Sequence, residues 1–303
     1  MTEAVGPGLW AIDTGYVRPR FDAVHLRVAG DRAALIDAGV GASAPRVLGA
    51  LDALGIPRDH VQYLILTHVH LDHAGGAGQL MAALPAARLV VHPRGARHMV
   101  DPARLVAGTV AVYGEAAFRQ LYGEILPIDE ARVLATGDGQ RLPFGGLELE
   151  LLHTPGHAKH HQVVVDPELG VFTGDTFGIA YPELQGPAPF LVATTTPTEF
   201  DLEALAASVR RIGATGARSA FLTHYSRVDG VADLVEPLIA DAAALWALSA
   251  GLPDMNGLVE QILGHWEARL AAAGAPGDRA AWRALLQADA TLNAMGLLHA
   301  RGR

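Results

Sequence analysis

The sequence contains no cysteine and only one lysine, Lys159. The absence of cysteine excludes disulfide bonds, thiolate nucleophiles and thiolate metal ligands. It also fits the cytoplasm, which is the location we expect. Charged residues make up 18% of the 303 residues, and the formal net charge is −9 at pH 7. Because the positive charge comes almost entirely from scattered arginines, we expect no nucleic-acid partner.

Long uninterrupted apolar runs are also missing. Residues 1–9 include Glu3 and no apolar stretch, so we expect no signal peptide. The most apolar region, residues 234–252, contains a proline and acidic residues and predicts helices, so we expect no membrane partner. Half of the residues are nevertheless hydrophobic, which is enough to bury a sizeable core.

The pattern of apolar residues changes near residue 230. Before it, β-rich runs such as 61–66 and 147–152 alternate with stretches of helical spacing such as 44–54. After it, the pattern predicts three helices, over 231–250, 257–273 and 278–299. We therefore expect an α/β domain at residues 1–230 and a helical C-terminal appendage at 231–303.

Three parts of the chain are expected to form the walls of the substrate pocket: residues 102–122, residues 177–198 and the C-terminal helices. Residues 102–122 predict a helical insertion, and residues 177–198 form a long stretch rich in Pro, Gly and Thr without a regular period. Ordered loops of this length tend to be functional. Residues 200–212 predict a helix with Thr198 as its N-cap.

The segment 67–73 reads Thr-His-Val-His-Leu-Asp-His and directly follows a predicted strand. Imidazole nitrogens and carboxylate oxygens are good ligands for zinc and similar divalent metals. In an extended turn His68 and His70 can point the same way, because side chains alternate with period two, and Asp72 and His73 can then face a second ion. A polar loop that is rich in histidine by chance does not explain four ligand-type residues at this spacing.

Three further ligand-type residues follow predicted strands. His157 comes after a Pro-Gly turn that swings it back toward the sheet edge. Asp175 follows Gly174, which permits a close backbone approach, and His224 again stands at a strand end. Loops at several strand ends thus deliver ligands to one edge of packed sheets.

This ordered pattern, His-x-His-x-Asp-His followed by a His, an Asp and a last His, resembles that of the metallo-β-lactamase superfamily. The resemblance spans about residues 8–226 and implies a four-layer αββα sandwich with a helical C-terminal extension. It also resembles the family's early Asp-x-Gly element at residues 35–39, where Asp37 would support the metal-binding loop. It implies that one ion is held by His68, His70 and His157, and the other by Asp72, His73 and His224, with Asp175 bridging the two.

The sequence lacks features that mark individual branches of this superfamily, which narrows the set of branches that it resembles. His70 stands where the di-iron oxygen-reducing branch carries glutamate, and the cysteine ligand and signal peptide of the secreted β-lactamases are missing. The glyoxalase II-like thioesterases and acyl-homoserine-lactone lactonases are similar at the motif level, as is a poorly characterised microbial group. The substrate is left open.

The resemblance implies a hydrolase that uses two divalent metal ions. Zinc is the expected ion, with iron or manganese as alternatives. A hydroxide bridging the ions would attack the carbonyl carbon of an ester, lactone or thioester. Asp72 is the candidate catalytic residue, because it can accept the proton of the nucleophile. The expected partner is a small acyl compound with an apolar portion, and a homodimer is possible.

Several other residues have an ordinary structural interpretation beside a functional one. His153 fits a buried structural role better than catalysis, and His161 either lines the site or is simply exposed at a strand start. Tyr181 and Tyr225 could each donate a hydrogen bond to a developing oxyanion, although packing of an amphipathic ring explains them more simply. Two other functions stay open: an iron-dependent oxidoreductase that uses the same ligands, and a binding module without catalysis.

Overall fold

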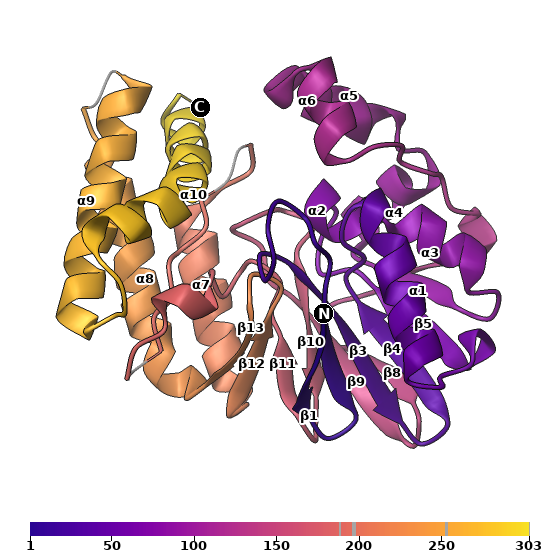
Figure 1. Cartoon of the computed structure of the whole chain (residues 1–303). Coiled ribbons are helices and arrows are strands. Elements are labelled where there is room, and N and C mark those ends of the chain that lie inside the picture. The colour runs from indigo at the N-terminus through magenta and orange to yellow at the C-terminus, as the bar shows by residue number, and fades with distance from the viewer. Residues whose placement is uncertain (188, 196–197, 252–253, 303) are drawn as a thin grey trace.

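Alternating β-branched and apolar runs in the first two thirds of the chain pair into two β-sheets. The computed structural model describes residues 1–187, 189–195, 198–251 and 254–302. The sheets pack face to face, and helices cover the outer face of each (Figure 1). The predicted αββα sandwich with C-terminal helices is thus confirmed.

The first sheet has the strand order β1-β2-β3-β4-β5-β6-β7. Strands β1 to β4 pair antiparallel, whereas β4 to β7 pair parallel, so β4 and β5 end at the same edge of the sheet. The strands are β1 (Thr2–Gly6), β2 (Leu9–Asp13), β3 (Ala23–Ala29), β4 (Arg32–Ile36), β5 (Val61–Ile65), β6 (Arg88–Val91) and β7 (Val133–Ala135).

The second sheet has the order β13-β12-β11-β10-β9-β8 and is antiparallel except for the parallel pair β11 and β12. Apolar side chains of both sheets meet in one buried cluster, to which Ile36 and Ile65 contribute from one side and Leu151 and Phe172 from the other. The strands are β8 (Gln140–Phe144), β9 (Leu147–His153), β10 (Gln162–Asp166), β11 (Gly170–Phe172), β12 (Ser219–Leu222) and β13 (Ser226–Asp229).

Helices cover both outer faces. Helices α1, α3 and α4 lie on the first sheet, α7 to α10 lie on the second, and α5 and α6 stand above the edge where the strands β4 and β5 end (Figure 1). The helices are α1 (Ala44–Ala53), α2 (Leu71–Ala74), α3 (Ala77–Ala83), α4 (Pro93–Val100), α5 (Ala103–Tyr113), α6 (Glu115–Leu121), α7 (Leu202–Ala214), α8 (Val231–Leu248), α9 (Met255–Ala273) and α10 (Arg279–Arg301).

The three predicted C-terminal helices are present as α8, α9 and α10. They share one hydrophobic cluster with the second sheet, in which Trp266 of α9 and Leu286 of α10 belong together with Val163 of β10 and Leu205 of α7. The division of the chain at residue 230 stays a prediction. No helix of the described residues has both the length and the apolar character that crossing a membrane requires.

The structure corrects the predicted N-cap of one helix and describes most of the long stretch 177–198. Helix α7 begins at Leu202 with Asp201 as its N-cap, whose side chain accepts from the N–H of Ala204, so the predicted cap at Thr198 is wrong. In the described residues of the stretch 177–198, regular structure is limited to a short 3-10 turn and a bridge between Ile179 and Val192. Residues 188, 196 and 197 of it lie outside the described residues.

Candidate metal centre

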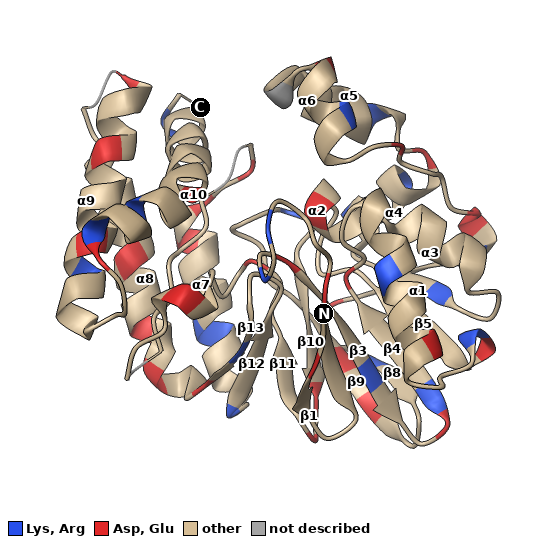
Figure 2. Ribbon diagram, in the orientation of Figure 1, with Lys and Arg blue, Asp and Glu red and all other residues tan. Residues whose placement is uncertain are grey.

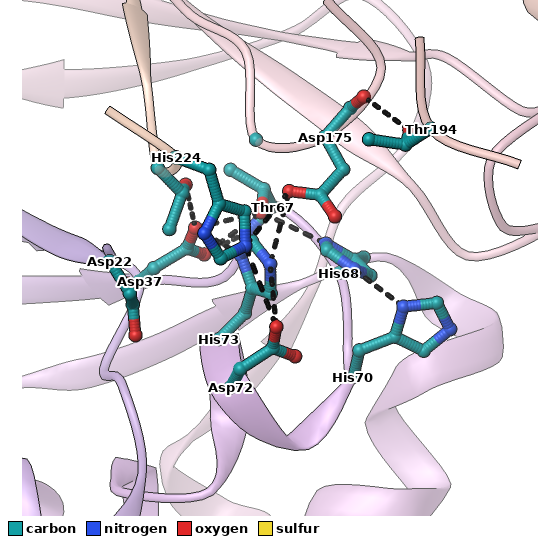
Figure 3. A network of polar contacts seen from close by, with 12 residues as sticks. Asp22, Asp37, Thr67, His68, His70, Asp72, His73, Asp175, Thr194 and His224 are labelled. Carbon is teal, nitrogen blue, oxygen red and sulfur yellow. Dashed lines mark hydrogen bonds and ion pairs between the residues drawn. The ribbon is translucent and has the colours of Figure 1, made fainter. Parts of the chain in front are cut away.

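The sequence-predicted ligands meet at one edge of the sandwich (Figure 3). The loops that carry them follow β5, β9, β11 and β12, whose C-terminal ends reach the same edge. Three sets of ligand atoms each lie within 4.8 Å of one another. These sets are His68, His70 and His157; His68, His73 and Asp175; and Asp72, His73 and His224.

In the first set, three ring nitrogens point at one another. His70 Nδ1 lies 2.9 Å from His68 Nε2 and 3.1 Å from His157 Nε2. The hydroxyl of Thr194 donates to the backbone oxygen of Asp175 (2.9 Å), so it accepts the Nδ1 hydrogen of His157 (2.9 Å). This leaves a lone pair on His157 Nε2. A single proton on His70 can satisfy only one of its two neighbours, whereas a metal ion satisfies all three nitrogens.

Asp72, His73 and His224 outline a second ion site, and they and the three histidines of the first set are the two ligand sets of the centre. His224 Nε2 lies 3.5 Å from Asp72 Oδ2, and His73 Nε2 lies 3.8 Å from the same oxygen. His224 Nδ1 donates to the backbone oxygen of Phe21 (2.8 Å), because a carbonyl oxygen can only accept. Its Nε2 faces the carboxylates, whose charge raises the pKa of His224 to about 9 despite burial, so this nitrogen lies where a cation is favoured.

Asp175 stands between the two sets. One carboxylate oxygen lies 3.1 Å from His73 Nε2 and 3.7 Å from His224 Nε2, and the other lies 3.5 Å from His157 Nε2. His73 Nε2 and Asp175 Oδ1 are buried and lack a hydrogen-bond partner among the described residues. Such a buried pair needs a proton or another cation between its two atoms, because either atom left without a partner is costly.

Asp37 orients His73 from behind. Its carboxylate accepts from the N–H and hydroxyl of Thr67 (2.8 and 2.9 Å), from the hydroxyl of Thr223 (2.8 Å) and from Nδ1 of His73 (2.8 Å). The residue itself adopts φ +62°, a left-handed conformation that is costly for aspartate. The strain and the four hydrogen bonds together fix the metal-facing nitrogen of His73, as supporting carboxylates do in metal sites.

The electrostatics of the site favour a positive charge between the carboxylates. Burial lowers the pKa of His73, but Asp175, Asp72 and Asp37 outweigh it and raise this pKa well above its ordinary value. Burial likewise opposes the ionised form of Asp175, yet His73 and His224 hold its pKa well below the ordinary value. The carboxylates are thus ready as anionic ligands for a cation.

The histidines of the first set are ready as neutral ligands. Burial lowers the pKa of His157 to about 3, and burial with the neighbouring imidazoles lowers that of His68 well below its ordinary value. A neutral imidazole is the form that binds a metal. The donor set of imidazoles and carboxylates, together with the facing lone pairs, fits two divalent ions.

Among the other sequence-predicted residues, His161 lies directly behind the site. Its ring stacks on His68 at 4.9 Å, its Nδ1 contacts the hydroxyls of Thr154 and Thr176, and the N–H of Asp175 donates to its Nε2 (3.2 Å). The residue is buried, so the interpretation of a solvent-exposed histidine is wrong. His161 supports the backbone of Asp175.

His153, the last residue of β9, contacts residues outside the ligand set. Its Nε2 donates to the backbone oxygen of Thr136 (3.0 Å), its N–H donates to Asp138 (2.8 Å), and its ring packs on His92 at 4.1 Å. These contacts are structural, and none of the contacts described joins His153 to a predicted ligand.

The two tyrosines occupy different surroundings. Tyr181 is buried and donates its hydroxyl hydrogen to Asp289 on α10 (3.1 Å), while its ring stacks on Phe21 at 5.5 Å. Tyr225 packs beside Arg20, and burial raises its pKa to about 12. In this structure the Tyr181 hydroxyl is therefore engaged by a carboxylate rather than directed at the ligand set.

Asp37→Ala is expected to weaken metal binding by about 10- to 100-fold, the usual cost of losing a residue that orients a ligand imidazole. The matched control is Asp31→Ala, because Asp31 is an exposed residue at the opposite end of β4. Metal titration of both purified variants measures the effect. Equal metal affinity in the two variants would show that His73 needs no support from Asp37.

Comparison with known proteins assigns the chain to a family. Residues 22–224 match the model of the metallo-β-lactamase superfamily. A metallo-β-lactamase fold-containing protein of Sulfurisphaera tokodaii is 29% identical over 215 residues, which are 67% of this chain and 73% of that protein. The crystal structure of an archaeal metallo-β-lactamase superfamily protein from Sulfolobus tokodaii superposes with a TM-score of 0.68 at 21% identity, over 96% of this chain and 98% of that one.

The Sulfurisphaera tokodaii relative and the protein of the crystal structure are the same archaeal protein. A second relative has a named activity. The atrochrysone carboxyl ACP thioesterase of Aspergillus fumigatus is 27% identical over 206 residues, 67% of this chain, and the match covers half of that enzyme's length. The matched family region runs from the residue after Phe21 to the last predicted ligand, His224, so it contains every predicted ligand. The chain belongs to the metallo-β-lactamase superfamily.

Proposed function

We propose that the protein is a hydrolase that uses two divalent metal ions to cleave an ester, lactone or thioester. The observation that supports this most directly is the pair of three-residue ligand sets with Asp175 between them. His68, His70 and His157 would hold one ion, Asp72, His73 and His224 the other, and Asp175 would touch both. Zinc is the first candidate, because imidazole and carboxylate ligands suit it.

Two such ions would supply a nucleophilic water at neutral pH and polarise the carbonyl of the substrate. The protein's own side chains contribute orientation and a proton acceptor. Asp72 is the most open of the set, with 24% of its side chain exposed against at most 7% for His73, Asp175 and His224. Burial opposes its ionisation, but His73 and His224 lower its pKa to about 2, so its carboxylate is present as an anionic ligand. Its open position beside the other ligands is what makes it the candidate proton acceptor.

The likeness to a thioesterase supports an acyl substrate. The Aspergillus relative is an ACP thioesterase, and a thioesterase hydrolyses a thioester. Beside the ligands, the ring of Phe21 lies edge-on to His224 and stacks on Tyr181, and Arg18 lies over both rings. Lys and Arg lie dispersed among Asp and Glu over the ribbon (Figure 2), and the prediction that no nucleic acid binds is retained.

The test uses the purified full chain loaded with zinc, manganese or iron and a panel of lactones, thioesters and aryl esters. Each assay is run with and without oxygen. We expect hydrolysis of at least one substrate class, independent of oxygen. Turnover that requires oxygen, with no member of the panel hydrolysed, would instead favour the iron-dependent oxidoreductase.

Removing the metal should abolish the hydrolysis. Dialysis against a chelator is expected to lower activity to the background rate, and adding back the divalent ion should restore it, because the donor set alone offers no activated nucleophile. Metal content measured in the same samples is the control. Full hydrolysis by metal-free protein would contradict the proposal.

A further inference from the structure

Two buried polar side chains on α10, Asp289 and Asn293, accept hydrogen bonds from Tyr181 and Thr195. Asp289 and Asn293 lie one helical turn apart, with 4% and 2% of each residue exposed. Buried polar groups on an otherwise apolar helix face are costly unless they are hydrogen-bonded. Both therefore need partners, and both find them in the stretch 177–198 that surrounds the site.

Asn293 holds Thr195. Its side-chain oxygen accepts from the N–H of Thr195 (2.7 Å) and from the hydroxyl of Thr195 (2.7 Å), and its amide donates back to the carbonyl of Asp289 (2.8 Å). The neighbouring residue Thr194 carries the hydroxyl that accepts from His157 Nδ1 and donates to the backbone of Asp175. Asn293 is thus linked through Thr195 and Thr194 to His157, a ligand of the three-histidine set.

Helix α8 secures the other side of the same segment. The buried carboxylate of Asp241 accepts from the N–H of Ala193 (2.8 Å). Asp241 is itself paired with His265 (2.8 Å) and Arg269 (2.7 Å) of α9, so it is firmly held. Ala193 and Thr195 are therefore fixed by different helices, and Thr194, between them, reaches the metal ligands.

Asp289 reaches the second ligand set. Its carboxylate accepts from the hydroxyl of Tyr181, whose ring stacks on Phe21. The backbone oxygen of Phe21 accepts from Nδ1 of His224, and the Phe21 ring meets the His224 ring edge-on at 5.1 Å. The N–H of Ala180, next to Tyr181, also donates to the backbone oxygen of His224.

The two chains of contacts are joined by the backbone. Ile179 and Val192 exchange hydrogen bonds of 2.9 and 3.1 Å, which tie the Tyr181 segment to the Thr194 segment. We propose that α10 is a positioning element of the metal centre: Asn293 sets the orientation of His157 through Thr195 and Thr194, and Asp289 sets that of His224 through Tyr181 and Phe21. The inference rests on the proposed function only in that these histidines hold metal.

The test measures metal binding directly, by cobalt(II) titration of the metal-free full chain followed through the visible spectrum. Asn293→Leu removes the acceptor while filling the space, which keeps water from replacing it. Asn256→Leu is the matched control, since Asn256 is an exposed residue near the start of α9. Circular dichroism and denaturant unfolding establish that each variant is folded.

We expect Asn293→Leu to weaken binding of one of two cobalt ions by about tenfold, near the lower end for residues that orient a ligand, and to alter its spectrum. Thr194→Val should weaken cobalt binding at least as much, whereas Thr194→Ser, which keeps the hydroxyl, should show the wild-type spectrum. Tyr181→Phe keeps the ring but loses the bond to Asp289, and should affect the other ion. Because each variant addresses one ligand set, the two ions should respond separately.

The proposal would be wrong if the Asn293→Leu variant folds and keeps the cobalt affinity and spectrum of the wild type. It would also be wrong if Asn256→Leu changes them by the same amount. In either case α10 would only pack against the rest of the protein. If Asn293→Leu does not fold, Thr195→Val decides by the same criterion, because it removes one of the two donors to Asn293. Failure of the proposed function is distinguishable. If the variants alter cobalt binding but the wild-type protein hydrolyses no substrate, the hydrolase proposal is wrong and the positioning role of α10 stands. If the protein is an active hydrolase but the variants bind cobalt like the wild type, the hydrolase proposal stands and the positioning role is wrong.

Discussion

Asp175→Ala is expected to lower hydrolysis by about 10³-fold or more, equivalent to roughly 4 kcal/mol of the reaction barrier. Asp175 is the residue whose two oxygens face ligands of both sets, at 3.1 Å from His73 Nε2 and 3.5 Å from His157 Nε2. Without it, both ions lose an anionic ligand, and the imidazoles of the buried site lose the charge that favours a cation.

Metal content of the same preparation should fall together with the activity. Asp59→Ala is the matched control, because Asp59 is exposed at the start of β5, the end opposite to the site. A variant that keeps its activity while holding no metal would contradict the whole assignment of the ligands. One that keeps both ions and full activity would show that Asp175 does not bind them.

The ligands could be predicted from sequence because each stands at a local landmark. His68 to His73 follow an apolar β-rich run, and Asp175 and His224 each follow a short strand of the second sheet. Strand ends of one sandwich converge at an edge, so residues that are far apart in the chain become neighbours without any long-range signal being needed. Asp37 also directly follows a strand, β4, but it was predicted from the resemblance to the family's Asp-x-Gly element.

The supporting contacts carry no such signal. Thr194, Thr195 and Asn293 are ordinary polar residues in sequence, and their roles depend on how α10 packs against the stretch 177–198. The oxygen of Phe21 that accepts from His224 belongs to the backbone, which no residue type marks. Contacts of this kind are set by tertiary packing, and a single sequence does not report it.

Some elements were missed although local chemistry indicates them. Helix α4 begins with Pro93 at its first position, and the His92 side chain accepts from the N–H of Arg94 as a cap. For α7, Thr198 is predicted as the N-cap, whereas Asp201, three residues further on, caps the helix. Strands β1, β7 and β8 are partly exposed and β2 is largely buried, and all four are short, so periodicity alone indicates them only weakly.

The turn that presents His157 should be among the least tolerant points of the fold. Gly156 adopts φ +131°, and a Cβ built there would lie 2.2 Å from the backbone nitrogen of Leu205 and 2.3 Å from its Cα. The backbone oxygen of Gly156 also accepts from the N–H of Asp201 (2.8 Å), the N-cap of α7. The turn and the first turn of α7 therefore touch backbone to backbone, and neither can give way as a flexible side chain would.

Gly156→Ala is expected to lower the free energy of unfolding by about 3–5 kcal/mol, combining conformational strain with the displacement of α7. Gly146→Ala is the matched control: Gly146 also has a positive φ, +93°, but a Cβ there meets no atom within 4 Å, so only the conformational cost, about 1 kcal/mol, should appear. Denaturant unfolding gives both values, and metal titration of folded Gly156→Ala should show weaker binding at the three-histidine set because His157 moves with the turn. If the two alanine variants proved equally stable, the close approach of the turn to α7 would not constrain the fold, and the position of His157 would have to be set by Thr194 alone.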